Sequence, residues 1–136
     1  MEMTVSGLAM PITLAFASIN ALIFLVLSIL VVRGRVEEEV AIGSGGKPRL
    51  ELKIRVHGNF AEYVPLALLL MALLEAAGYS ATVLCLLGTV LTLGRLSHAI
   101  GLSRGAKPNA FRFMGTLATW IIIAASAVMG LHATLF

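Results

Sequence analysis

Residues 3–32 contain no charged side chain, and this apolar run limits the environments in which the chain can fold. A transmembrane helix needs about twenty consecutive apolar residues to cross the hydrocarbon core of a bilayer. The run is longer than that, so it accommodates one spanning helix with some tilt. It is also too long for the apolar region of a signal peptide, and no basic residue precedes it. We therefore expect it to remain as a membrane anchor.

The composition extends this expectation to the rest of the chain. Of the 136 residues, 59% are hydrophobic and 12% are charged, whereas an average soluble domain has about 25% charged residues. A soluble domain of this size lacks the interior to bury so much apolar surface. We therefore expect residues 1–136 to form one domain that has lipid as its main solvent. The single cysteine, Cys85, excludes an internal disulfide.

Four apolar segments predict an all-α, four-helix transmembrane bundle. Polar stretches with basic residues interrupt the apolar runs after residues 32 and 102, and the turn Gly78-Tyr79-Ser80 separates the second segment from the third. Pro65 lies inside the second segment, and Asn109 is a candidate N-cap for the fourth. We place the spanning helices at residues 8–32, 50–78, 81–102 and 109–134.

The basic residues indicate how the chain is oriented in the membrane. All ten lie in or beside the first and third connections: Arg33, Arg35, Lys47, Arg49, Lys53 and Arg55 near the first, and Arg95, Arg104, Lys107 and Arg112 near the third. The positive-inside rule predicts that both connections are cytoplasmic and that both termini lie outside the cytoplasm. Because these cations flank apolar runs and not a polar face with aromatic residues, we do not expect nucleic-acid binding.

The second helix is expected to enter the bilayer near Gly58, so two glutamates, Glu62 and Glu75, lie within its membrane-crossing part. A carboxylate in the hydrocarbon region costs roughly 2.5–3.5 kcal/mol on insertion scales, and it commonly marks a functional site. Glu75 is close enough to the outer end to reach the interface, but Glu62 is not. On a helix, Arg55, Asn59 and Glu62 share one face because they are spaced four and three residues apart.

Arg95 and His98 share a face of the third helix, and we expect them at the same membrane depth as Glu62. One interpretation is structural: Glu62 pairs with Arg95, while Asn59 and His98 form hydrogen bonds to neighbouring helices. The other is a cleft that binds an anion, because nearby cations exceed what one carboxylate can neutralise. The two interpretations are compatible, since an ion pair between helices can also line a pocket.

These residues resemble a known family. Residues 55–65, Arg-Val-His-Gly-Asn-Phe-Ala-Glu-Tyr-Val-Pro, resemble the second-helix signature of the MAPEG family, the membrane-associated proteins of eicosanoid and glutathione metabolism. Residues 94–98 are similar to its third-helix Arg-x-x-His element, and residues 112–115 to the start of its fourth helix. The resemblance covers all four spans and is closest to the bacterial branch, which implies a multi-pass protein of the inner membrane.

The resemblance implies a homotrimer that binds glutathione between adjacent subunits near the cytoplasmic face. Glutathione carries two carboxylates and one ammonium group. Several cationic side chains would complement the carboxylates, and one buried anionic side chain would complement the ammonium group. No metal site is expected. By position in the motifs, the resemblance assigns the tripeptide to Arg55, Asn59, Glu62, Tyr63, Arg95 and His98, with Arg33 or His57 from the neighbouring subunit.

The implied activity is that of a transferase or peroxidase acting on lipophilic electrophiles from the bilayer. A free thiol has a pKa of about 8.5, and an adjacent guanidinium favours the thiolate. Family members use an arginine at the third connection or the start of the fourth helix, which here indicates Arg112 and, as second choice, Arg104. Leu102 occupies a position where many family enzymes have a tyrosine, so contacts to the second substrate are expected to differ.

A non-enzymatic membrane module is the alternative function. The chain would then be a lipid-binding scaffold or an accessory subunit, and its polar stripes would serve assembly alone. The short connections favour this reading. A channel or transporter is less well supported, because the sequence has neither a ring of pore charges nor repeated broken helices.

Overall fold

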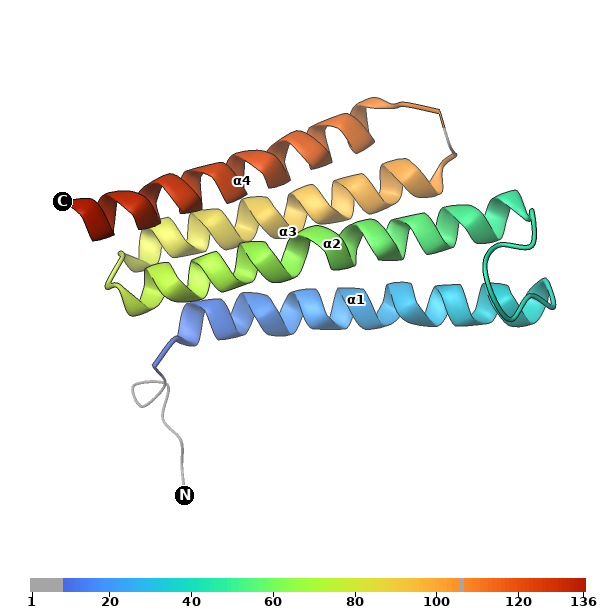
Figure 1. Cartoon of the computed structure of the whole chain (residues 1–136), viewed down its shortest axis with the longest axis horizontal. Helices are drawn as coiled ribbons and strands as arrows, with labels where there is room; N and C mark the ends of the chain where they lie inside the picture. The colour runs from blue at the N-terminus through green and yellow to red at the C-terminus, as the bar shows by residue number, and fades with distance from the viewer. Residues whose placement is uncertain (1–8, 106) are drawn as a thin grey trace, which may run out of the picture.

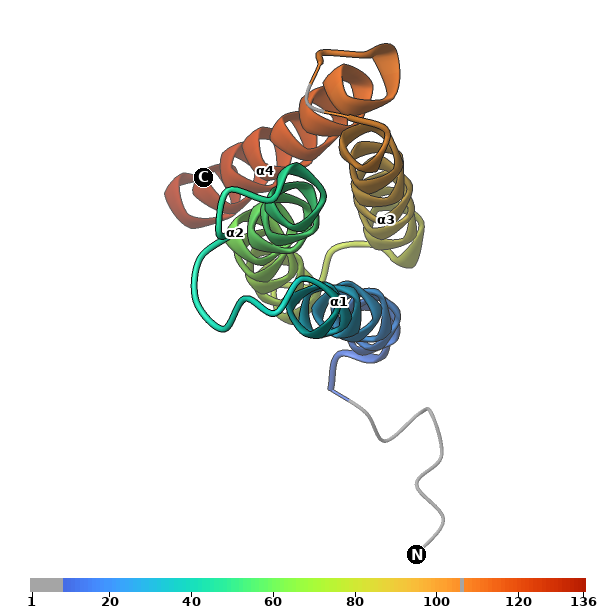
Figure 2. The ribbon, with the colours of Figure 1, turned by 90° about the vertical axis from the view of Figure 1, so that its right-hand side faces the viewer.

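A computed structural model describes residues 9–105 and 107–136 of the chain. Its helices are α1 (Pro11–Glu37), α2 (Pro48–Ala76), α3 (Ala81–Ser103) and α4 (Ala110–Leu135), which run up and down side by side (Figure 1). Each helix is long and apolar enough to cross a membrane. This confirms the predicted all-α class with four spanning helices. Viewed along the bundle, α2 lies between α1 and α4 and also packs against α3 (Figure 2).

The helix ends follow local backbone chemistry more than apolarity. Helix α1 continues to Glu37, past the predicted limit of the span at residue 32, because charged residues can prolong a helix outside the hydrocarbon core. Helix α2 starts with Pro48. Proline lacks an N–H, but an N–H in the first turn of a helix would have no partner within the helix, so proline is well tolerated there. It ends before Gly78, which has a left-handed φ of 84° that glycine adopts most readily.

The two basic connections lie together at one end of the bundle. The α2–α3 turn, the start of α1 and the C-terminus lie at the opposite end (Figure 1). All ten Lys and Arg residues therefore belong to the half of the bundle that carries the α1–α2 and α3–α4 connections. Which compartment that half faces stays a prediction.

Helices α3 and α4 approach each other through glycines. A Cβ added at Gly115 would contact the carbonyl oxygen of Gly94 and would lie 2.6 Å from the backbone nitrogen of His98. Nearer the connection, Asn109 accepts a hydrogen bond from the Arg112 N–H at 3.0 Å and donates one to the Gly101 carbonyl at 2.7 Å. Asn109 is therefore the N-cap of α4, as predicted, and it also joins α4 to α3.

Glu75 binds the first turn of α1. Its two carboxylate oxygens accept hydrogen bonds from the backbone N–H groups of Ile12, at 2.9 Å, and Thr13, at 2.7 Å. These N–H groups have no partner within their own helix, and a negative charge at a helix N-terminus also interacts favourably with the helix dipole. The second intramembrane glutamate thus joins the end of α2 to the start of α1.

The glycine contact predicts the effect of a single methyl group. We expect Gly115→Ala to lower the free energy of unfolding by about 1–3 kcal/mol, because the added Cβ overpacks the α3–α4 contact. Unfolding of the detergent-purified protein by a denaturing surfactant measures this change.

Gly130 provides the matched control on the same helix. A Cβ at Gly130 would meet no heavy atom within 4 Å, so Gly130→Ala should be neutral or stabilising by up to about 1 kcal/mol. Equal effects of the two substitutions would contradict a close approach at Gly115.

Candidate functional site

A buried arginine lies at the centre of the polar residues. The side chain of Arg95 on α3 is 1% exposed, and its Nη2 donates a hydrogen bond of 2.6 Å to Oδ1 of Asn59 on α2. The aromatic rings of Phe60 and Tyr63 each have their centroid 5.7 Å from the guanidinium carbon. The same Nη2 lies 3.4 Å from Nδ1 of His98. The cation is thus enclosed by a neutral amide and two π faces of α2.

Glu62 forms no direct ion pair with this arginine within the described part of the chain. Among the described residues, no Lys or Arg nitrogen lies within 4 Å of its carboxylate, and the side chain is exposed. Of the two readings of the polar stripe, an ion pair between Glu62 and Arg95 within one chain is therefore wrong. Three residues at about 100° each leave Glu62 about 60° around α2 from Asn59, so Asn59 meets Arg95 while Glu62 lies at the exposed edge of the same stripe.

Beside Arg95, a pocket of about 220 Å³ opens between α2, α3 and α4 near the basic connections. Four residues that the sequence singled out line it together: Arg55, Asn59, His98 and Arg112. The other lining residues are Glu51, Leu52 and Leu102. The structure therefore brings the stripes of α2 and α3 and the start of α4 to one hollow.

Sequence reasoning missed Glu51. This residue precedes Arg55 by one helical turn, as Arg55 precedes Asn59, so the four-residue spacing places all three on one face. The signal was therefore present in the sequence. Glu51 adds one carboxylate to a pocket that also holds two guanidinium groups, and the balance of the lining charges stays positive.

The position of Arg112 follows from the junction of α3 and α4. A Cβ at Gly101 would lie 2.5 Å from the Arg112 nitrogen, so only glycine lets the last turn of α3 approach the first turn of α4 this closely. The start of α4 thereby reaches the pocket. Because a helix N-terminus carries a partial positive charge, it adds to the positive potential of the two arginines. The arrangement favours an anionic ligand.

Several predicted site residues lie elsewhere in the single chain. The guanidinium of Arg104 stacks on Phe111, 4.6 Å from its ring centroid, and His57 packs against Phe24 of α1 at a centroid distance of 4.6 Å. Arg33 is exposed at the end of α1. The pocket of Arg55 and Arg112 therefore does not include Arg104, Arg33 or His57.

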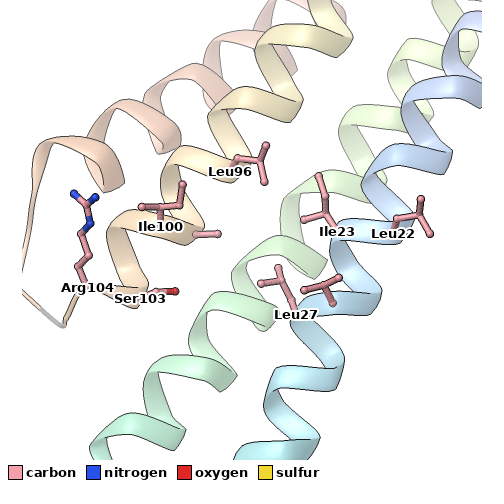
Figure 3. Close-up of a pocket in the computed structure, with 9 residues that line it drawn as sticks. Leu22, Ile23, Leu27, Leu96, Ile100, Ser103 and Arg104 are labelled. Atoms are coloured by element: carbon pink, nitrogen blue, oxygen red, sulfur yellow. The ribbon is translucent and has the colours of Figure 1, made fainter.

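Arg104 instead borders an apolar groove between α1 and α3. Figure 3 shows the groove, which has a volume of about 580 Å³, with leucine and isoleucine side chains of both helices along it. The guanidinium of Arg104 points away from α1 at one end of the groove. Of the two arginines considered for the thiolate, Arg112 alone lines the polar pocket.

The fold and the site together define a class: a four-helix membrane protein with a cation-rich pocket at one end of its bundle. The chain belongs to the MAPEG family, whose family model matches residues 13–132. It is 38% identical over 105 residues to the inner membrane protein YecN of Escherichia coli strain K12. The aligned residues make up 77% of this chain and 79% of YecN. YecN of E. coli O6:H1 strain CFT073 matches to the same extent. These similarities confirm the family recognised from the motifs.

The partner of Arg95 can be tested by removing it. We expect Asn59→Ala to lower the free energy of unfolding by about 1.5–3 kcal/mol, because it breaks a hydrogen bond to a buried charged group. Glu62→Gln should change it by less than about 0.5 kcal/mol, as is usual for an exposed side chain. Surfactant unfolding of both variants measures the difference. A larger loss for Glu62→Gln would mean that the carboxylate, and not the amide, compensates the buried cation.

Proposed function

We propose that the protein binds glutathione in the pocket of Arg55 and Arg112 and uses it to modify lipophilic electrophiles from the bilayer. The observation that carries the proposal is the convergence of Arg55, Asn59, His98 and Arg112, from three helices, on one hollow in an otherwise apolar bundle. Glutathione has two carboxylates, and guanidinium groups bind carboxylates with paired hydrogen bonds. Its ammonium group requires an anion, for which Glu51 and Glu62 are the candidates.

The size of the pocket supports a site completed by a second subunit. At about 220 Å³, it is smaller than the roughly 300–1,000 Å³ that small-molecule sites usually occupy. Glu62 is exposed on the single chain. This exposure is expected of a residue that contacts a ligand or a subunit outside its own bundle. We therefore infer a homo-oligomer, with a trimer as the expected form, in which Arg33 or His57 of a neighbouring subunit adds to the site.

The reaction that we propose begins with the cysteine thiol of glutathione beside Arg112. The guanidinium lowers the thiol pKa by stabilising the thiolate, and the proton passes to water. The sulfur then attacks the electrophilic carbon and displaces its leaving group. With a peroxide it attacks an oxygen and breaks the O–O bond, which releases the alcohol and leaves a sulfenic acid that a second glutathione converts to the disulfide and water. The electrophile would enter from lipid, since α3 and α4, which border the pocket, expose large apolar side chains on their outer faces.

The proposed location follows from the same assignment. Glutathione is dissolved in the cytoplasm, and the positive-inside rule predicts that the basic connections face that compartment. The pocket lies at that end of the bundle. We infer an inner-membrane protein whose site opens to the cytoplasm, with both termini on the other side.

Binding is the first test. Isothermal titration of the detergent-purified protein with glutathione should give saturable heat at millimolar concentration or below. Arg55→Ala should weaken binding by roughly tenfold or more, because a charge-assisted hydrogen bond contributes about 1.5–3 kcal/mol. Lys107→Ala is the control for charge, since Lys107 is exposed and does not line the pocket. No heat with the native protein would reject the function and favour the alternative of a scaffold or accessory subunit.

Catalysis tests the role of Arg112. We expect Arg112→Ala to reduce conjugation to a chromogenic electrophile by roughly an order of magnitude or more near pH 7, where an unactivated thiol is only a few per cent ionised. The rate of the variant should rise with pH toward about 8.5, the ordinary thiol pKa, while the rate of the native protein should change less. Gel filtration checks that the oligomer is intact. A loss with Arg104→Ala, but not with Arg112→Ala, would transfer the role to Arg104.

A further inference from the structure

Arg95 makes both of its polar side-chain contacts through one nitrogen. Its Nη2 donates to Oδ1 of Asn59 at 2.6 Å and lies 3.4 Å from Nδ1 of His98. A guanidinium nitrogen donates hydrogen bonds and accepts none, and Nη2 has two N–H groups, one for each neighbour. Both neighbours must therefore present an acceptor to Arg95. This requirement determines which atom each of them turns the other way.

For Asn59, the requirement sets the orientation of the side-chain amide. Its Oδ1 meets Arg95, so Nδ2, which carries two donors, lies at the other end of the amide group. Asn59 lines the pocket of Arg55 and Arg112. Within the part of the chain that the structure describes, Nδ2 has no hydrogen-bond partner and is not closed off from solvent. Asn59 therefore offers N–H donors to the pocket.

For His98, the same requirement sets the tautomer. A ring nitrogen of histidine accepts only when it carries no proton, so the proton is on Nε2 and the ring is neutral. His98 lines the same pocket, and among the described residues its Nε2 has no partner. Nε2 of His57 is buried without a partner, whereas Nε2 of His98 is not closed off in this way. His98 therefore offers an N–H donor as well.

The pocket is polarised along α2. Asn59 and His98 supply neutral donors, and Arg55 and Arg112 supply guanidinium groups. Of the described residues that line the pocket, only Glu51 has a side chain limited to accepting. Glu51 precedes Asn59 by about two helical turns, or about 12 Å of helix, and lies nearer the end of the bundle. Donors therefore surround the part of the pocket that is deeper in the membrane.

Arg95 controls this arrangement from behind the pocket. It is 1% exposed and is not part of the pocket lining, so it does not reach a ligand there. Without its two N–H groups, the amide of Asn59 could flip and the ring proton of His98 could move to Nδ1. Each change would turn an acceptor toward the pocket, where it would repel a carboxylate instead of binding it.

We propose that Arg95 is a positioning residue that makes Asn59 and His98 a pair of N–H donors, and that this pair receives a carboxylate of the bound ligand. A carboxylate has two accepting oxygens, one for each donor. The proposal deepens the proposed function and rests on it only for the identity of the ligand, because the donors are oriented before any ligand binds.

Nitrogen NMR of the ligand-free protein reads the tautomer. The full-length protein is labelled with nitrogen-15 in its three histidines and purified in detergent, and the signals lost in His98→Gln identify His98. We expect a protonated Nε2 and a bare Nδ1. Arg95→Met removes both donors and should populate both tautomers. A native protein with a proton on Nδ1, or a folded Arg95→Met variant with the native tautomer, would overturn the proposal.

Acetate is the probe for a carboxylate, and acetamide is its neutral counterpart. Acetate should shift the Nε2 signal of His98 saturably, while acetamide at the same ionic strength should shift it severalfold less. His132 is the internal control, because it is exposed near the end of α4 that lies opposite the basic connections. Equal shifts of His98 by the two probes, or equal shifts of His98 and His132 by acetate, would contradict the proposal.

Asn59→Asp separates the donor from the fold and does not depend on the folding of Arg95→Met. The aspartate still accepts from Arg95, through a charge-assisted hydrogen bond, but it has no donor for the pocket. We expect the variant to fold and its affinity for acetate and for glutathione to fall at least tenfold, the loss typical of one hydrogen bond to a charged group. Native affinity in this variant would reduce Asn59 to a structural role and overturn the proposal.

Ser103→Asp is the control for the added negative charge. Ser103 is exposed near the same end of the bundle and does not line the polar pocket, so both affinities should stay unchanged. The two proposals fail separately. A native response to acetate without heat from glutathione would reject the proposed function and support the role of Arg95. Glutathione binding by a protein whose His98 carries its proton on Nδ1 would do the reverse.

Discussion

The hydrogen bond between Arg95 and Asn59 is the interaction on which the polar part of the bundle depends. It holds α3 to α2 through a charged group that is buried almost completely, and its acceptor is a neutral amide. An acidic partner would cancel the charge of the arginine, whereas Asn59 stabilises the guanidinium and leaves its charge in place. The positive potential behind the pocket of Arg55 and Arg112 therefore has a structural origin that is independent of any ligand.

Helix α2 distributes its functions around its circumference. Arg55 and Asn59 line the polar pocket with α3 and α4, and Ala61 and Pro65 line an apolar pocket of about 290 Å³ with α1. Glu62 points in a third direction, out of the bundle. The residues of this short signature therefore make contacts within the bundle and line a polar and an apolar pocket. They also include one carboxylate that is available to a neighbouring subunit.

The sequence predicted the fold well because lipid imposes length and apolarity on every span, and residues such as Asn109 mark helix starts by their own chemistry. Spacing along one helix also grouped Arg55 with Asn59, and Arg95 with His98. Spacing does not fix the rotation of one helix against another. The interpretation that paired Glu62 with Arg95 was therefore wrong, because Asn59 meets this arginine. Spacing also left open whether Arg104 or Arg112 would line the pocket. The proposed roles of Arg33 and His57 depend on contacts between subunits. Neither residue spacing nor the structure of a single chain determines those contacts.

The carboxylate of Glu75 has a consequence for biogenesis. It accepts hydrogen bonds from the N–H groups of Ile12 and Thr13, which precede it by more than sixty positions. During synthesis α1 emerges first, and its leading turn lacks these two carboxylate contacts until the far end of α2 has crossed the bilayer. The two helices are then most stable as an inserted hairpin, so the translocation of α2 completes the anchoring of α1.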